Sequence, residues 1–208
     1  MFLGTKAGVI TLRWERAGWR QVDTSLAGHD VWAVAHRPGD PRTLYAGVYG
    51  DNLYRSEDAG QTWHAIGDDE AMQYVRSIAF SPRRADTLYV GTEPANIYQS
   101  SDGGDTWRNL GIRELAGSEG WSLPYSPRAG AVRTFALHQV ERDLVYAGVE
   151  QGGVLRSADD GKTWTITRDG VHPDIHTLAL HPDDPNLLFA ATGGGVYRSR
   201  DGAETWER

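Results

Sequence analysis

One eight-residue pattern recurs four times along the chain and limits its fold more than any other feature. The copies read SEDAGQTW (56–63), SSDGGDTW (100–107), SADDGKTW (157–164) and SRDGAETW (199–206). Their tryptophans lie 44, 57 and 42 residues apart, which indicates repeated units of one supersecondary structure. We refer to the pattern S-x-D-x-G-x-T-W as the box.

A fifth unit precedes the first box. Counting 44 residues back from Trp63 leads to Trp19, in GTKAGVITLRWERAGW, where Trp14 stands at the position of the box aspartate. The 57-residue interval contains extra residues in RELAGSEGWSLPYSPRAG, which predicts an insertion over 112–129. The expected boundaries of the units within a single domain are 1–24, 29–68, 73–111, 130–168 and 174–208.

Each unit predicts four short strands. The first strand is VWAVAHR in the second unit, the second is TLYAGV, the third is NLYRS, and a short fourth strand begins near the box tryptophan, as in TWHAI. Such runs, rich in β-branched and aromatic residues and bounded by Gly, Pro and Asp, indicate strands, and no helical period competes with them.

These units predict an all-β protein, a β-propeller of four-stranded antiparallel blades. The first unit begins at its second strand and the last scarcely reaches its fourth, so we count 18 strands in five blades with imperfect first and last blades. A closed five-bladed ring is favoured. A piece of a larger propeller, or two chains that complete one ring, remain alternatives.

Every residue of the box has a predicted folding role. Ser and Asp accept backbone N–H groups in the turn, Gly supplies a positive φ, and Trp buries a large aromatic face. Ala203 replaces the glycine of the last copy and would strain its turn. The residues assigned this structural role are Ser56, Asp58, Gly60, Trp63, Ser100, Asp102, Gly104, Trp107, Ser157, Asp159, Gly161, Trp164, Ser199, Asp201 and Trp206.

The pattern resembles the Asp-box, or BNR repeat, of sialidases, sortilin-type receptors, xyloglucan-active propellers and the photosystem II assembly propeller. The resemblance covers nearly the whole sequence and implies the propeller fold. A calcium site built from the box aspartates is disfavoured, because one carboxylate per blade cannot supply the six to eight oxygens that one ion needs. We expect no metal and no cofactor.

Composition excludes some partners. The formal net charge of −7 makes a nucleic-acid backbone a poor candidate, and the absence of cysteine excludes disulfides and thiolate metal sites. No signal peptide or apolar run long enough to cross a membrane is visible, so a cytoplasmic location is expected if Met1 is the native start.

The candidate site lies at the end of the blades opposite the boxes, where the beginnings of the first strands converge. The aligned units diverge there and become polar, charged or aromatic. The second residue of each first strand is a candidate ligand-binding residue: Trp32, Arg76, Arg133 and His176. The inserted segment adds Trp121 and Tyr125 as a recognition loop, although Trp121 could equally pack against its neighbouring blade.

Resemblance to sialidases would imply an arginine clamp, a Tyr–Glu nucleophile pair, an acid/base Asp and an R-I-P motif. The sequence contains no R-I-P and offers two arginines in the relevant positions. If the chain were a glycosidase, its candidate catalytic residues would be Glu93, Glu150, Tyr49, Asp30 and Asp174.

The favoured function is therefore non-catalytic. We expect a binding or assembly propeller whose site takes a protein segment or a small anionic or sugar-like ligand. A glycoside hydrolase, and a structural propeller that self-associates through its imperfect edge blades, are the alternatives. A solution mass of twice 22.9 kDa would favour a homo-oligomer.

Overall fold

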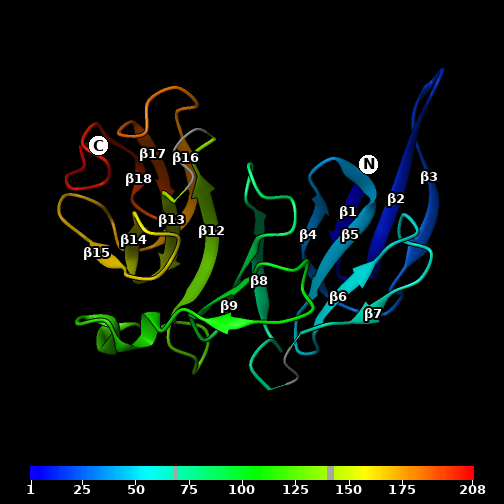
Figure 1. Ribbon diagram of the computed structural model, residues 1–208, viewed down its shortest axis with the longest axis horizontal. Coiled ribbons are helices and arrows are strands. Elements are labelled where there is room, and N and C mark those ends of the chain that lie inside the picture. Colours follow the sequence, from blue (N-terminus) through cyan, green and yellow to red (C-terminus); the bar gives the residue numbers. More distant parts are fainter. Residues whose placement is uncertain (68–69, 140–142) are drawn as a thin grey trace.

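The computed structural model describes residues 1–67, 70–139 and 143–208, which form five antiparallel sheets that contain 18 strands (Figure 1). The second, third and fourth sheets have four strands each, and the first and last have three. This confirms the all-β propeller and its imperfect first and last blades. Within those described residues no helix is long and apolar enough to cross a membrane.

We number the blades along the chain. Blade 1 contains β1 (Phe2–Thr5), β2 (Gly8–Glu15) and β3 (Gly18–Ser25). Blade 2 contains β4 (Val31–Arg37), β5 (Asp40–Val48), β6 (Leu53–Ser56) and β7 (His64–Ala65). Blade 3 contains β8 (Val75–Phe80), β9 (Leu88–Thr92), β10 (Ile97–Ser100) and β11 (Arg108–Asn109). Blade 4 contains β12 (Ala131–Leu137), β13 (Val145–Glu150), β14 (Gly153–Ser157) and β15 (Thr165–Thr167). Blade 5 contains β16 (Ile175–Leu180), β17 (Leu188–Thr192) and β18 (Gly195–Ser199). Two short 3₁₀ turns, η1 (Ile112–Glu114) and η2 (Ser118–Gly120), lie in the insertion.

The blades follow one another along an arc, with blade 1 and blade 5 at its two ends (Figure 1). Successive first strands contact one another, β4 with β8, β8 with β12, and β12 with β16. Within residues 1–67, 70–139 and 143–208 the blades do not close into the expected five-bladed ring. Val196 on β18 is accordingly 63% exposed, whereas its counterpart Val154 on β14 is fully buried.

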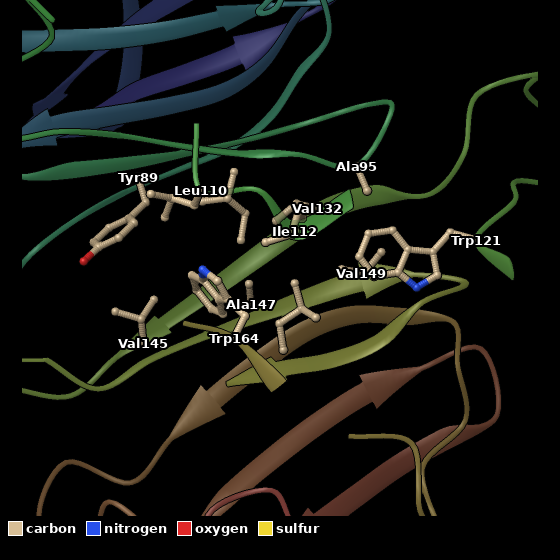
Figure 2. Close-up of a cluster of buried hydrophobic side chains, with 12 residues drawn as sticks. Tyr89, Ala95, Leu110, Ile112, Trp121, Val132, Val145, Ala147, Val149 and Trp164 are labelled. Carbon is tan, nitrogen blue, oxygen red and sulfur yellow. The ribbon is translucent and has the colours of Figure 1, made fainter. Parts of the chain in front are cut away.

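The core is a series of interfaces between neighbouring blades. Figure 2 shows one of them, where Tyr89 of blade 3 and Val132, Val145 and Trp164 of blade 4 lie in a single buried cluster. A glycine on the second strand permits this close approach: a Cβ on Gly91 would lie 2.7 Å from the Cβ of Val132. The corresponding glycines, Gly47 and Gly148, meet the first strand of the next blade in the same way.

The boxes form turns between the third and fourth strands, as predicted. The Oδ1 atom of Asp58 accepts the backbone N–H groups of Gln61 and Thr62, each at 2.9 Å, and Ser56 Oγ accepts that of Gly60 at 2.8 Å. Because these carboxylates are saturated by donors within their own turns, they serve the fold. Hydrogen bonds from Thr163 and Ser157 accordingly lower the pKa of Asp159 to about 2.

The box tryptophans pack against the preceding blade. Trp63 Nε1 donates to Ser25 Oγ at 2.9 Å, and Trp107 Nε1 donates to the Ile66 carbonyl at 2.9 Å. Ala203 adopts a φ of 72°, so the predicted strained turn is present in the last copy.

The first unit has no box turn. Trp14 and Trp19 face each other across the β2–β3 hairpin with their ring centroids 5.3 Å apart, and they are 64% and 54% exposed. Trp19 therefore aligns with the box tryptophans in sequence, but unlike Trp164 and Trp206 it is not buried.

Candidate binding site

Four β-bulges place the candidate ligand-binding residues. In each of blades 2 to 5 the pairing between the first and second strands skips one residue, between Val31 and Ala33, Val75 and Ser77, Val132 and Thr134, and Ile175 and Thr177. The skipped residues are Trp32, Arg76, Arg133 and His176. A bulge redirects its extra side chain away from the regular faces of the sheet. The same local device therefore presents a different side chain from each blade.

A second column of residues follows the second strands and lies beside the bulges. Tyr49, Glu93 and Gly193 each donate a backbone N–H to the residue two positions before a bulge, at 2.8, 2.9 and 3.0 Å. The acceptor in blade 2 is the carbonyl of Asp30, which joins the site by its backbone. These hydrogen bonds hold both columns together at one end of the strands, and the boxes lie at the other end.

A single buried guanidinium links blades 3 and 4. The side chain of Arg76 is 3% exposed; its Nη1 lies 3.1 Å from Glu93 Oε2, and its Nη2 lies 3.5 Å from Glu150 Oε2. Arg133, whose side chain is 33% exposed, donates from Nη1 to the same Glu150 oxygen at 2.9 Å. The structure therefore brings together both predicted arginines and both candidate catalytic glutamates.

Aromatic rings from blade 2 border this ion network. The guanidinium carbon of Arg76 lies 4.1 Å from the centroid of the Trp32 ring, and Trp32 stacks on Tyr49 with centroids 4.7 Å apart. Trp32 nevertheless remains 43% exposed. It is an aromatic group in contact with both the buried cation and the surface.

The inserted segment divides into a part that lies at the site and a part that lies in the core. Tyr125 Oη donates to Glu150 Oε2 at 2.7 Å, and Tyr125 is 57% exposed. Trp121 is only 3% exposed and belongs to the cluster between blades 3 and 4 (Figure 2). Trp121 therefore packs against its neighbouring blade, which is the alternative to ligand recognition.

Two residues of the insertion were missed by the sequence reasoning. Arg128 Nη1 lies 3.3 Å from Glu93 Oε1, and its guanidinium carbon lies 3.6 Å from the centroid of the Tyr74 ring. Ser126 Oγ donates to the same Glu93 oxygen at 2.8 Å. The sequence SPR in a Pro- and Gly-containing insertion resembles a solvated turn, so no local signal marked these residues.

The electrostatics of the site keep Glu150 ionised. Burial raises its pKa, but hydrogen bonds from Tyr125 and Arg133 and the charges of Arg133 and Arg76 outweigh burial and hold the pKa below its usual range. Burial and the hydrogen bond to Glu150 raise the pKa of Tyr125 to about 12, so its hydroxyl stays a donor. Glu150 is therefore an anionic acceptor at neutral pH and not a proton donor.

At the blade 5 side, Glu150, Asp174 and His176 each offer one ligand atom within 4.8 Å of the others. His176 Nε2 lies 3.1 Å from Asp174 Oδ1. Arg133 already occupies the Glu150 oxygen, so a cation bound there would compete with a guanidinium.

Comparison with known proteins supports the fold and gives a partial family match. The family model described as sortilin, neurotensin receptor 3 matches residues 51–127. The xyloglucanase Xgh74A of Acetivibrio thermocellus is 30% identical over 95 residues, which is 38% of this chain and 11% of that enzyme. Vacuolar protein sorting/targeting protein 10 of Pyricularia oryzae is 30% identical over 66 residues, 31% of this chain and 4% of that protein. The chain thus spans about a tenth or less of the length of these curated relatives.

Solved structures agree at the level of fold. The extracellular domain of BT4673 from B. thetaiotaomicron superposes with a TM-score of 0.72 and 20% identity, over all of this chain and 25% of that one. An ancestral GH74 enzyme superposes with a TM-score of 0.70 and 16% identity, over 86% of this chain and 24% of the enzyme. The chain is an Asp-box repeat β-propeller, and its residues 51–127 are similar to the sortilin family.

Proposed function

We propose that this chain is a non-catalytic binding propeller whose bulge residues recognise a carboxylate on a sugar or a peptide. The observation that carries the proposal is the set of four bulges, which place Trp32, Arg76, Arg133 and His176 around one ion network. Regular strand positions are occupied by contacts between blades. The bulges add residues beyond those positions, and three of them, Trp32, Arg133 and His176, stay exposed enough to reach a ligand, whereas Arg76 is buried beneath them.

The exposed guanidinium of the site favours an anionic group. Three guanidinium groups, those of Arg76, Arg128 and Arg133, contact two carboxylates, those of Glu93 and Glu150. The carboxylate of Asp174 offers an oxygen within 4.8 Å of Glu150 and offsets the one extra positive charge, so an anion would be bound by exposed guanidinium donors and not by net charge. Arg133 is the most exposed of the three, and a guanidinium can bind a carboxylate through two parallel hydrogen bonds. Exposed aromatic surface on Trp32 adds apolar contact.

The same network argues against glycoside hydrolysis by Glu93 and Glu150. Such hydrolysis needs two carboxyl groups on either side of the scissile bond, one of them protonated with a raised pKa. Here one guanidinium bridges both carboxylates, and the pKa of Glu150 is lowered. The relatives that are xyloglucanases make the test direct: we expect no turnover of xyloglucan oligosaccharides, and turnover that disappears in Glu150→Gln would refute the proposal.

Binding can be measured by NMR with two probes, glucuronate and an acetylated Asp–Glu dipeptide, with glucose as the uncharged control. We expect either charged probe to shift the indole N–H resonance of Trp32, assigned from Trp32→Phe. The resonance of Trp14, which is 64% exposed and lies on blade 1, should stay in place.

Arg133→Gln should abolish the shift of the Trp32 resonance, whereas Arg20→Gln on the exposed β2–β3 hairpin should preserve it. If neither charged probe shifts Trp32, or if glucose shifts it equally, the site does not recognise carboxylates.

A further inference from the structure

The edge strand β1 occupies an unusual place in its blade. β1 pairs with β2, and the order of the sheet is β1-β2-β3. In blade 2 the equivalent strand, β5, lies between β4 and β6. Among the residues that the structure describes, no strand pairs with the other edge of β1. Blade 1 therefore presents an open edge on the side where the other blades have their first strand.

The backbone groups at this edge can be identified from the pairing. Met1 and Leu12 exchange two hydrogen bonds, at 2.9 and 2.8 Å. Because antiparallel strands alternate between paired and outward-facing residues, Phe2 and Gly4 direct their N–H and C=O groups away from β2. These two residues form the hydrogen-bonding surface of the open edge.

The equivalent residues of blade 2 show what this surface accepts. Tyr45 and Gly47 of β5 occupy the positions of Phe2 and Gly4, and they pair with Ala35 and Ala33 of β4. Both partners are small, because this side of the first strand faces the next blade at close range.

The rule holds in every complete first strand of the chain. The two alternate positions are Ala and Ala in β4, Ser and Ala in β8, and Thr and Ala in both β12 and β16. The residue between them is large and apolar, as in Ile78 and Phe135. Ser77 also donates from Oγ to the carbonyl of Val132 in the next blade at 2.7 Å, which shows how closely this side is packed.

An apolar hollow of about 270 Å³ lies beside the open edge. Its lining residues are Met1, Phe2, Val34, Ala35, His36 and Leu44. Met1 and Leu3 are 50% and 40% exposed. A first strand paired with β1 would cover this hollow, as β4, β8 and β12 each pack on the first strand of the blade that follows.

We propose that the open edge of β1 binds an extended strand of a partner polypeptide, antiparallel to β1, with Ala, Ser or Thr at the two positions opposite Phe2 and Gly4 and a large apolar residue between them. Main-chain hydrogen bonds supply affinity in such strand addition, and the side-chain pattern supplies selectivity. This proposal is independent of the ligand site, which lies on the bulges of blades 2 to 5.

A synthetic peptide with the sequence of residues 130–138, GAVRTFALH, is the probe, because it carries Thr134 and Ala136 at the small positions. Hydrogen exchange by NMR in the 208-residue chain should slow at the amides of Phe2 and Gly4 when the peptide is added. The amide of Thr5, which faces β2, should change little.

Two peptide variants test the pattern. Ala136→Phe in the peptide should weaken binding by about tenfold or more, since the small side cannot accept an aromatic ring. Phe135→Trp, on the other side, should be tolerated. Equal binding of a scrambled peptide, or protection confined to blade 5, would overturn the proposal.

Two variants of the chain complete the test. His36→Asp should weaken the peptide by about tenfold, because it puts a charge into the apolar hollow that the strand would cover, where the next blades have Phe80 and Leu137. His64→Asp, on the exposed strand β7, is the matched control and should leave binding unchanged. Peptide binding unaffected by His36→Asp would mean that the strand binds elsewhere.

Discussion

Replacing Arg76 with Met should destabilise the protein more than any other single change at the site. The side chain of Arg76 is 3% exposed, and it pairs with Glu93 and Glu150, whose side chains are 0% and 6% exposed. Removing one partner of a buried ion pair costs about 3–5 kcal/mol, because the remaining charge has lost both water and its partner. Stabilities of about 5–15 kcal/mol leave room for such a variant to fold.

The pH dependence of this cost follows from Glu150. Its pKa is lowered in the folded protein, so its stabilising contribution is present above the unfolded pKa, near 4.3, and is lost as pH falls through the folded pKa. Without Arg76 one cause of that lowering disappears. The difference in unfolding free energy between wild type and Arg76→Met should therefore be largest near pH 7 and shrink below about pH 4.

Urea unfolding followed by tryptophan fluorescence at both pH values measures this difference. Arg133→Met, at a side chain that is 33% exposed, should cost only about 1 kcal/mol and serves as the control. Adding Glu93→Gln and Glu150→Gln to Arg76→Met should restore most of the lost stability, since no buried charge remains. A cost for Arg76→Met below about 1 kcal/mol at pH 7, or one that does not depend on pH, would refute the reasoning.

Three further predictions concern the repeat itself. Gly148→Ala should lower the free energy of unfolding by roughly 1–2 kcal/mol in urea, because the added Cβ would lie 2.6 Å from carbons of two side chains. Ala191→Gly, at the equivalent exposed position of blade 5, should cost less than about 1 kcal/mol. Equal costs would contradict the interface role of the glycine. Val154→Ala should lower the free energy of unfolding by about 2 kcal/mol and Val196→Ala by less than about 0.5 kcal/mol, since the two side chains are 0% and 63% exposed. A large loss of stability for Val196→Ala would mean that this face of blade 5 is covered in solution. The pKa of Asp159 is about 2 in the folded protein, so its carboxylate stabilises the fold above the unfolded pKa. Asp159→Asn should therefore lower stability near pH 7, and the stabilities of variant and wild type should converge as pH falls to about 2 in circular dichroism titrations. A stability difference that stays constant with pH would exclude this coupling between protonation and folding.

Much of the fold could be predicted because each box residue has one local role. The turn bonds of Ser56 and Asp58 depend on residues within four positions in the chain, so the pattern alone specifies them. The count of 18 strands in five sheets follows from the same repeats. Ring closure could not be predicted, since it depends on the angle between successive blades, and no short sequence pattern encodes that angle.

The aligned repeats predicted which positions belong to the site, but not which side chains contact one another there. Aligning the repeats identified Arg76, Arg133 and Glu150, because positions that carry no interface are free to differ between blades. The ion pair between Arg76 and Glu150 joins residues 74 positions apart in two blades, so it depends on how the blades are placed relative to each other. Arg128 lies in the insertion, which has no counterpart in the other units, so no column revealed it.

The bulges explain how a chain of near-identical units can have one specific site. Each regular position on a first strand faces one neighbouring blade or the other, and both faces are restricted in size, as Ala79 and Ile78 illustrate. A bulge adds one residue that belongs to neither face, so Trp32, Arg76, Arg133 and His176 can differ fully in charge and shape without altering the packing between blades. The cost of changing such a residue should then depend only on its contacts within the site. Replacing Arg76 should lower stability strongly because it is the ion-pair partner of two buried carboxylates. His176, with a side chain 45% exposed, should accept substitution with little loss of stability.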